Sequence, residues 1–81
     1  MYYVYVLKSR KTSEIYVGST SDLRERFLSH NGSKNLATKK SIPWGLVYYE
    51  AYSRKELALN RERQLKCYGK GLAMLKERVG L

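Results

Sequence analysis

The chain has 81 residues, and its 16 Lys and Arg against 7 Asp and Glu give a formal net charge of +9. This length predicts one domain over residues 1–81 and excludes two separate hydrophobic cores. The lone Cys67 excludes an intrachain disulfide and, with the single His30, a zinc site. The charge predicts a polyanionic partner, nucleic acid before an anionic membrane, but does not separate an enzyme from a passive binder.

The amino-terminal third predicts a β-hairpin. Residues 2–7 are aromatic or β-branched on both faces, which is typical of a central strand. The two predicted faces consist of Tyr3, Tyr5 and Leu7, and of Tyr2, Val4 and Val6. Residues 15–19 predict a second strand, antiparallel to the first across a polar loop. Gly18 in this strand lacks a Cβ, so another group can approach its backbone closely.

A helix is predicted directly after the second strand. Its candidate N-caps are Thr20, Ser21 and Asp22. Leu23 and Phe27, four residues apart, predict its apolar stripe, and Arg26 and His30 repeat the same spacing. The helix is expected to end near Asn31-Gly32, where glycine favours a left-handed terminator.

The second half of the chain predicts one more strand and two more helices. Residues 33–41 are expected to form a loop with room for one helical turn at residues 36–37. Residues 46–52 predict the third strand, and the capping box from Ser53 to Glu56 opens a long helix to about Tyr68. Residues 72–79 predict a last short helix. The economical fold is α+β, a small three-stranded antiparallel sheet flanked by helices. Its expected buried residues are Val4, Val6, Val17, Leu23, Phe27 and Leu65.

Several polar residues in these elements suit phosphodiester hydrolysis, which needs an activated water, neutralised phosphate charge and a stabilised leaving oxygen. Tyr5 or Tyr16, on neighbouring strands, can handle a proton. Arg26 can fork onto phosphate oxygens, and His30 can shuttle a proton or hydrogen-bond the phosphate. Glu62 is held towards the protein body and needs an arginine or a metal as its partner. One carboxylate is enough for Mg²⁺, which keeps several waters.

Each candidate also has a structural interpretation. A tyrosine in a strand is usually a core residue, Arg26 can form a salt bridge, and His30 can cap its helix. Glu62 can pair with a basic neighbour on its own helix. The basic residues expected to contact nucleic acid are Lys34, Lys39, Lys40, Arg61, Arg63 and Lys66. On spacing alone, a nuclease and a passive nucleic-acid-binding module therefore both stay open.

Taken together, these motifs resemble the GIY-YIG nuclease superfamily, above all its small stand-alone bacterial members. Tyr3-Val4-Tyr5 and Tyr16-Val17-Gly18 stand where that family has its two signature tripeptides. The family's arginine, its His or Tyr, and its metal-binding glutamate match Arg26, His30 and Glu62. The resemblance covers nearly the whole chain. The chain departs from the family's pattern at Tyr3, in place of the first glycine, and at Ser19, where some members have lysine. It also lacks an asparagine in residues 69–75, where many members have one.

The resemblance implies hydrolysis of DNA with a single Mg²⁺ or Mn²⁺ at Glu62, phosphate stabilisation by Arg26 and proton handling by a tyrosine. The expected function is a structure-selective or weakly sequence-specific endonuclease of DNA repair or recombination. The alternative is a non-catalytic nucleic-acid-binding module that keeps the fold. RNA stays open as a substrate, and a protein partner or homodimer can supply further DNA contacts. Without a signal peptide or a long apolar run, the chain is expected to be cytoplasmic with no membrane partner.

Overall fold

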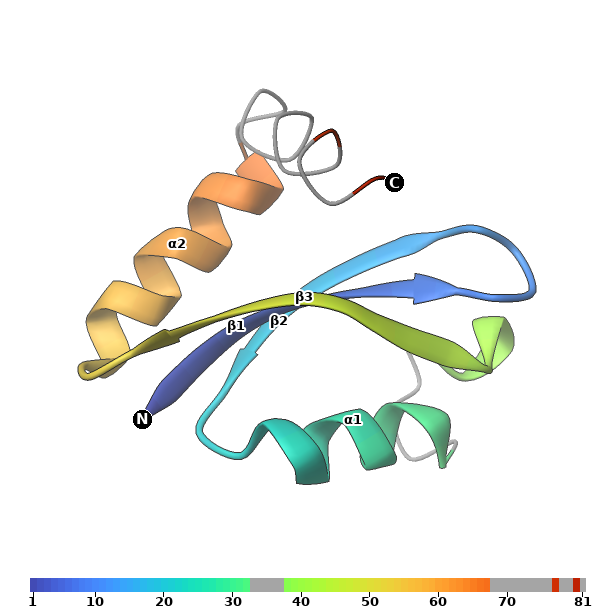
Figure 1. The fold of residues 1–81 in the computed structure, drawn as a ribbon, viewed down its shortest axis with the longest axis horizontal. Helices are drawn as coiled ribbons and strands as arrows, with labels where there is room; N and C mark the ends of the chain where they lie inside the picture. Colours follow the sequence, from blue (N-terminus) through green and yellow to red (C-terminus); the bar gives the residue numbers. More distant parts are fainter. Residues whose placement is uncertain (33–37, 68–76, 78–79, 81) are drawn as a thin grey trace.

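One three-stranded antiparallel sheet with a helix on each face forms the fold (Figure 1). The computed structural model describes residues 1–32, 38–67, 77 and 80. In chain order, the elements are β1 (Tyr2–Ser9), β2 (Ile15–Thr20), α1 (Leu23–Asn31), the 3-10 helix η1 (Lys39–Ser41), β3 (Trp44–Tyr52) and α2 (Lys55–Cys67). The strand order is β2-β1-β3. The predicted α+β architecture is confirmed.

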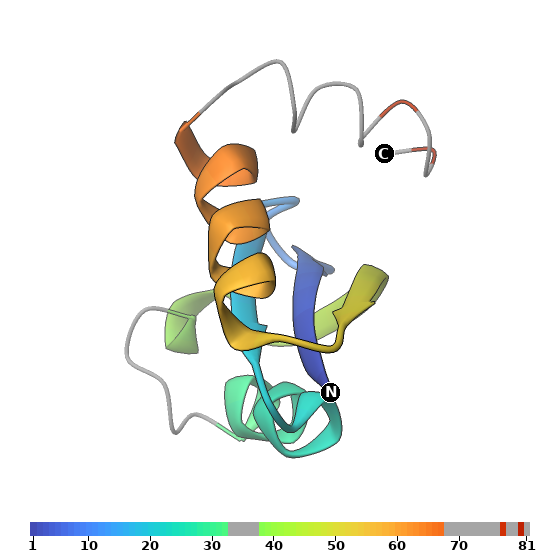
Figure 2. The same ribbon diagram turned by 90° about the vertical axis from the view of Figure 1, so that its left-hand side faces the viewer.

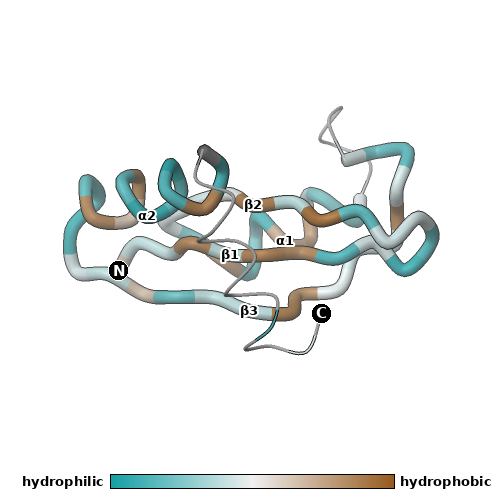
Figure 3. Tube along the Cα trace, turned by 90° about the horizontal axis from the view of Figure 1, so that it is seen from above, coloured by the Kyte–Doolittle hydropathy of each residue, from teal (hydrophilic) through white to brown (hydrophobic). Residues whose placement is uncertain are grey.

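The central strand β1 supplies the core of both layers, as its two apolar faces predict. Val4, Tyr5, Val6 and Leu7 are each at most 1% exposed. Figure 3 shows this hydrophobic stretch between the two edge strands. The cluster beneath α2 consists of Val4, Val6, Val17, Ala58 and Leu65. The cluster beneath α1 consists of Tyr5, Leu7 and Trp44, with Tyr16, Leu23, Phe27 and Ile42 packed against it. Figure 2 shows the two helices on opposite sides of the sheet.

Helix α1 begins and ends where the sequence predicts, but the conformation of its C-cap residue differs from the prediction. Of the three candidate N-caps, Asp22 accepts a hydrogen bond from the Glu25 amide at 3.0 Å. The Gly32 amide closes the helix by donating to the carbonyls of Leu28 and Ser29. Gly32 has a φ of −90°, so the expected left-handed terminator is wrong. The helix therefore ends on ordinary backbone that satisfies two free carbonyls.

The expected burial of Leu23 and Phe27 is also wrong, because both are only half-buried. They line an open hollow of about 470 Å³ between α1 and β3, together with Tyr49. The one fully buried residue of α1 is His30. This helix therefore packs on the sheet through the buried ring of His30 as well as through its half-buried apolar stripe.

The third strand changes face part-way along. A β-bulge lies between Val6 and Leu7 of the β1–β3 ladder, since Val6 pairs with Tyr48 and Leu7 with Leu46. The extra residue reverses the alternation of side chains. As a result, Trp44 packs in the cluster beneath α1, whereas Tyr48 packs in the cluster beneath α2.

Some predicted features lie outside the described residues: the helical turn at residues 36–37, Lys34, Tyr68 and the helix of residues 72–79. Within the described ranges, β1 and β3 are each two residues longer than predicted, and α2 begins at Lys55. No helix among these residues has the length and apolar character needed to cross a membrane.

Candidate active site

The candidate site lies at the outer edge of β2, where Tyr5 of the central strand reaches across its neighbour. Tyr5 and Gly18 are partners in the β1–β2 ladder. A Cβ built on Gly18 would lie 2.4 Å from the Tyr5 hydroxyl and 2.6 Å from the ring carbon that bears it. Only glycine leaves room for this ring. The close approach expected at Gly18 is therefore made by a tyrosine of the same sheet.

A buried hydrogen-bonded chain fixes the Tyr5 hydroxyl. It lies 2.9 Å from His30 Nε2, and His30 Nδ1 lies 2.9 Å from the Thr38 hydroxyl. Both His30 and Thr38 are fully buried. Burial, with Arg26 second, lowers the pKa of His30 below its ordinary value of 6.5. The neutral imidazole has one donor and one acceptor nitrogen, so the chain can run in either direction.

Tyr5 keeps its proton in this environment. Burial, reinforced by the nearby Tyr16, raises the pKa of Tyr5 above its ordinary value of 10.0, although Arg26 acts in the opposite direction. His30 is fully buried, and its two ring nitrogens face the hydroxyl groups of Tyr5 and Thr38 rather than solvent.

The second tyrosine, Tyr16, lies beside this chain and is half-buried. Its ring centroid is 4.8 Å from that of His30 in an edge arrangement and 6.4 Å from that of Tyr5. The Lys66 ammonium lies 5.8 Å from the centre of the Tyr16 ring, within the range of a cation–π contact. Tyr16 is thus the more accessible of the two candidate proton-handling groups.

Arg26 lies on α1 and is half-buried. Its charge lowers the pKa values of both Tyr5 and His30. Among the residues that the structure describes, its side chain forms no ion pair or hydrogen bond. A half-buried guanidinium without a carboxylate partner is well suited to bind an anion.

Glu62 lies on α2, on the face of the sheet opposite to α1, and contacts the end of β2 (Figure 1). Its Oε1 accepts a 2.6 Å hydrogen bond from the Ser19 hydroxyl, and its Oε2 lies 2.6 Å from Lys66 Nζ. Burial raises its pKa, but hydrogen bonds from Lys66 and Ser19 outweigh this and hold the pKa of Glu62 below its ordinary value. The structural interpretation, in which Glu62 pairs with a basic neighbour on its own helix, is therefore met by Lys66. The contact with Ser19 was not predicted, and its signal in the sequence was only the place of Ser19 directly after the second tripeptide.

A hollow of about 220 Å³ opens next to these groups. Arg26 and Lys55 supply positive charge to its wall, and the residues lining it are Tyr2, Ser19, Thr20, Ser21, Arg26, Lys55, Ala58 and Leu59. It joins the end of β2 to the start of α2. Lys55 was not among the basic residues predicted to contact nucleic acid. Nothing in the sequence distinguishes it except its place in the first turn of the helix. The hollow has the charge and the hydroxyl donors that a phosphate group requires.

The remaining basic candidates are spread over the surface. Lys39 and Lys40 are exposed on η1, and Arg63 is exposed on α2, where it donates to Asn60 at 3.4 Å. Arg61 differs from its expected role, because its guanidinium pairs with Glu50 on β3. Lys34 lies outside the described residues. The structure thus brings Lys66, but not Arg61, to the site.

The single carboxylate of Glu62 suits a weakly bound Mg²⁺ or Mn²⁺. The described residues contain no group of three or more His, Cys, Asp or Glu side chains that could bind a metal. The Glu62 carboxylate, with 19% of its side chain exposed, is reachable, and the Lys66 side chain paired with it is 47% exposed. Mg²⁺ commonly binds through one carboxylate, waters and substrate phosphates. The geometry fits that pattern.

Comparison with known proteins agrees with this geometry. The family model of the GIY-YIG catalytic domain matches residues 1–70. The chain belongs to the GIY-YIG family. The match covers β1 with Tyr5, β2 with Tyr16, α1 with Arg26 and α2 with Glu62. It makes the protein a member of a nuclease family.

Relatives of this GIY-YIG chain are similarly small. A UPF0213 protein of Staphylococcus haemolyticus is 36% identical over 80 residues, covering 95% of this chain and 96% of the relative. A UPF0213 protein of Streptococcus pyogenes serotype M5 is 37% identical over 65 residues, covering 79% of this chain and 70% of the relative. No solved structure gives a significant match to the chain.

Proposed function

We propose that this GIY-YIG protein is a metal-dependent DNA endonuclease whose single domain, residues 1–81, hydrolyses phosphodiester bonds at the edge of β2. The observation that carries the proposal is the half-buried guanidinium of Arg26, which lines the hollow at the end of β2 and has no carboxylate partner among the described residues. Leaving a cation unpaired in such a place is costly unless it binds an anion. A scissile phosphate supplies that anion.

Each side chain has one task in the proposed reaction. Arg26 binds the phosphate and stabilises the charge that grows on it. Tyr16, being accessible, takes the proton of the attacking water or passes it to solvent. Tyr5 stays protonated and is positioned by His30. Glu62 holds a single Mg²⁺ or Mn²⁺, which when bound neutralises phosphate charge and stabilises the leaving oxygen.

The basic surface supports a nucleic-acid substrate. Lys55 lies with Arg26 around the hollow, and Lys66 is beside Glu62, so phosphates on either side of the cleaved bond meet a cation. Lys39 and Lys40 are exposed for contacts further along the strand. Contacts of this kind are made to phosphate groups, which carry no sequence information directly. Structure-selective or weakly sequence-specific cleavage, with a role in repair or recombination, therefore suits the protein best, and a homodimer or protein partner would extend its contacts.

A second candidate is a non-catalytic nucleic-acid-binding module. It is favoured by one contact, the 2.6 Å approach of Lys66 Nζ to Glu62 Oε2. This pair neutralises the carboxylate without a metal. If the Lys66 ammonium stays paired with Glu62 when nucleic acid binds, no metal binds to Glu62. The basic residues around the hollow then bind phosphates without cleaving them.

A nicking assay on branched and plain duplex DNA, with Mg²⁺ or Mn²⁺, separates the two candidates. Arg26→Ala should lower the cleavage rate by about 10²- to 10³-fold, the loss typical of one transition-state donor. The matched control is Arg24→Ala, which removes an exposed arginine of the same helix that does not line the hollow. Wild-type protein that binds but never cleaves would favour the binding module, whereas equal cleavage rates for the two variants would refute the role of Arg26 in the reaction.

A further inference from the structure

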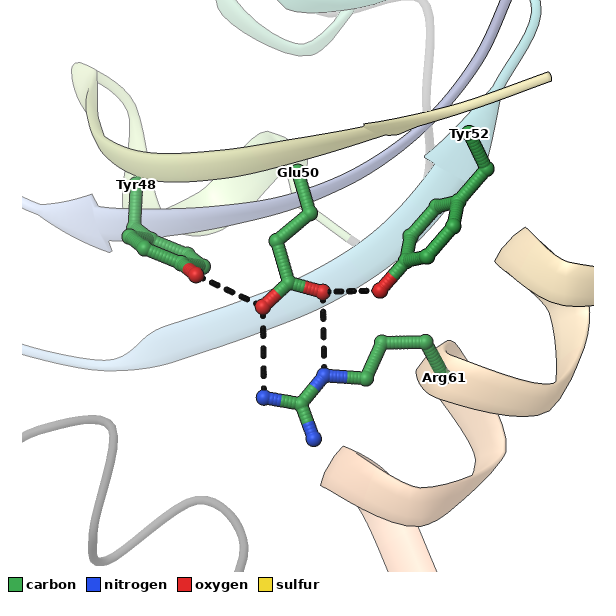
Figure 4. Close-up of polar contacts among 4 residues, drawn as sticks. All are labelled: Tyr48, Glu50, Tyr52 and Arg61. Atoms are coloured by element: carbon green, nitrogen blue, oxygen red, sulfur yellow. Dashed lines mark hydrogen bonds and ion pairs between the residues drawn. The ribbon is translucent and has the colours of Figure 1, made fainter.

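A second cluster of polar residues lies on the other side of α2, away from the candidate site. We call it the Glu50 cluster; it consists of Tyr48, Glu50, Tyr52 and Arg61 (Figure 4). The Glu50 carboxylate accepts from the Tyr48 hydroxyl at 2.6 Å and from the Tyr52 hydroxyl. It also accepts from Arg61 Nε at 3.0 Å and from Arg61 Nη2 at 3.2 Å. Four hydrogen bonds therefore converge on one carboxylate.

The Glu50 cluster is a strong and partly buried contact. The side chains of Arg61 and Glu50 are 29% and 18% exposed, in contrast to 68% and 56% for the Arg54–Glu56 pair at the start of α2. Burial raises the pKa of Glu50, but its hydrogen bonds from Tyr48, Tyr52 and Arg61 outweigh burial and hold it below the ordinary value. A two-pronged Arg–carboxylate contact fixes direction as well as distance.

Arg61 and Glu62 are consecutive, so their side chains leave α2 about 100° apart. Arg61 reaches Glu50 on β3, one edge of the sheet, and Glu62 reaches Ser19 on β2, the other edge. Between them, Ala58 and Leu65 pack on the central strand. These apolar contacts hold α2 against the sheet, and a directional polar contact lies at each edge.

We propose that the Glu50 cluster is the positioning device of the active site: by holding Arg61 at the β3 edge, it fixes the rotation of α2 that presents Glu62 at the β2 edge. Tyr48, Glu50, Tyr52 and Arg61 are thus positioning residues, with no contact to substrate. The inference rests on the proposed nuclease function for its effect on cleavage, but the placement of Glu62 can be measured without DNA.

The bulge in β3 is the feature that makes this device possible. Because it reverses the alternation, Tyr48 faces α2 although Trp44, four residues earlier, faces α1. Glu50 and Tyr52 then follow Tyr48 on the α2 side. Without the bulge, Glu50 would point to the α1 face, away from Arg61.

The test uses Glu50→Gln, Arg61→Gln and the double variant of the full chain. The matched control is Glu56→Gln, which breaks the exposed ion pair with Arg54 on the same helix. Tyr48→Phe is a milder variant that removes one of the hydrogen bonds. Two measurements are made well below the unfolding temperature of every variant: the NMR cross-peak between the side chains of Ser19 and Glu62, and broadening of their signals by Mn²⁺ alone.

If the Glu50 cluster positions Glu62, Glu50→Gln and Arg61→Gln weaken the Ser19–Glu62 cross-peak and lower the Mn²⁺ affinity by about 10- to 100-fold, the range found for positioning partners of metal ligands. Glu56→Gln changes neither, and the double variant is no worse than the singles. If the variants stay folded and keep both the cross-peak and the Mn²⁺ affinity, the proposal is overturned and the cluster only adds stability. A lost cross-peak in a protein that never cleaves DNA supports the positioning role and rejects the nuclease function.

Discussion

Adding a single methyl group at Gly18 gives the most direct structural test of how Tyr5 is held. In Gly18→Ala, the new Cβ would lie 2.4 Å from the Tyr5 hydroxyl, about 1 Å short of the 3.4 Å at which ordinary contact begins. Tyr5 is only 1% exposed, and its hydroxyl is bound to His30, so the ring cannot turn aside freely. The ring must shift and the hydrogen bond must lengthen or break.

The free energy of unfolding should fall by a few kcal/mol. Overpacking a core costs about 1–3 kcal/mol, and leaving the buried His30 nitrogen without a partner costs about 1–3 kcal/mol more. Replacing glycine by alanine in a strand by itself stabilises the folded state by about 0.5–1 kcal/mol, because alanine loses less conformational entropy on folding. The net loss is about 3 kcal/mol, which for a domain of this size lowers the unfolding temperature by roughly 12–24 °C.

Gly45→Ala is the control for thermal and urea unfolding of this variant. A Cβ at Gly45 would lie 3.5 Å from the Arg10 side chain, an ordinary contact, so this substitution should be neutral or slightly stabilising. The reasoning would be refuted if the two alanine variants unfolded at the same temperature, since Tyr5 would then not lie across Gly18.

Three further predictions concern stability, the proton and the partner. Because burial lowers the pKa of His30, the folded protein binds a proton less readily than the unfolded chain; stability should therefore fall as the pH drops from about 7.5 to 5.5, and His30→Asn should abolish this slope in urea titrations. Tyr16→Phe should reduce the cleavage rate more than Tyr5→Phe, whereas Tyr5→Phe should lower the unfolding temperature more; the reverse order would exchange their roles. Replacing Lys39 and Lys40 by Ala should weaken DNA binding and reduce its salt dependence by about one unit of slope per lysine, with turnover of bound DNA unchanged; an affinity independent of salt would contradict this.

The sequence predicted the sheet well because its signals are local. The alternation of residues 2–7 correctly separated the side chains of the two core clusters. The absence of a Cβ predicted a close approach at Gly18, although not that Tyr5 makes it. The start of α1 was equally predictable, since Asp22 is a residue type that is common at the N-cap. These features depend on neighbours within one or two elements.

The features that the sequence did not predict depend on distant contacts. The bulge in β3 is set by packing across the sheet, so the face of Glu50 and its pairing with Arg61 were not predictable from alternation alone. In the same way, His30 was expected at a helix end but is fully buried, because Thr38 from beyond the helix completes its hydrogen bonds. The predicted basic cluster counted Arg61 by charge, which does not reveal an ion pair.

The central claim is that Glu62 holds a catalytic metal, and the most direct measurement compares cleavage by wild type, Glu62→Gln and Glu56→Gln over a range of Mg²⁺ and Mn²⁺ concentrations. Gln keeps the size of the side chain and can still accept from Ser19, but it removes the charge that retains the cation. We expect Glu62→Gln to stay folded, to bind DNA at least as tightly, and to lose cleavage by orders of magnitude at every metal concentration, while Glu56→Gln cleaves like wild type. Cleavage by Glu62→Gln at the wild-type rate would contradict the account.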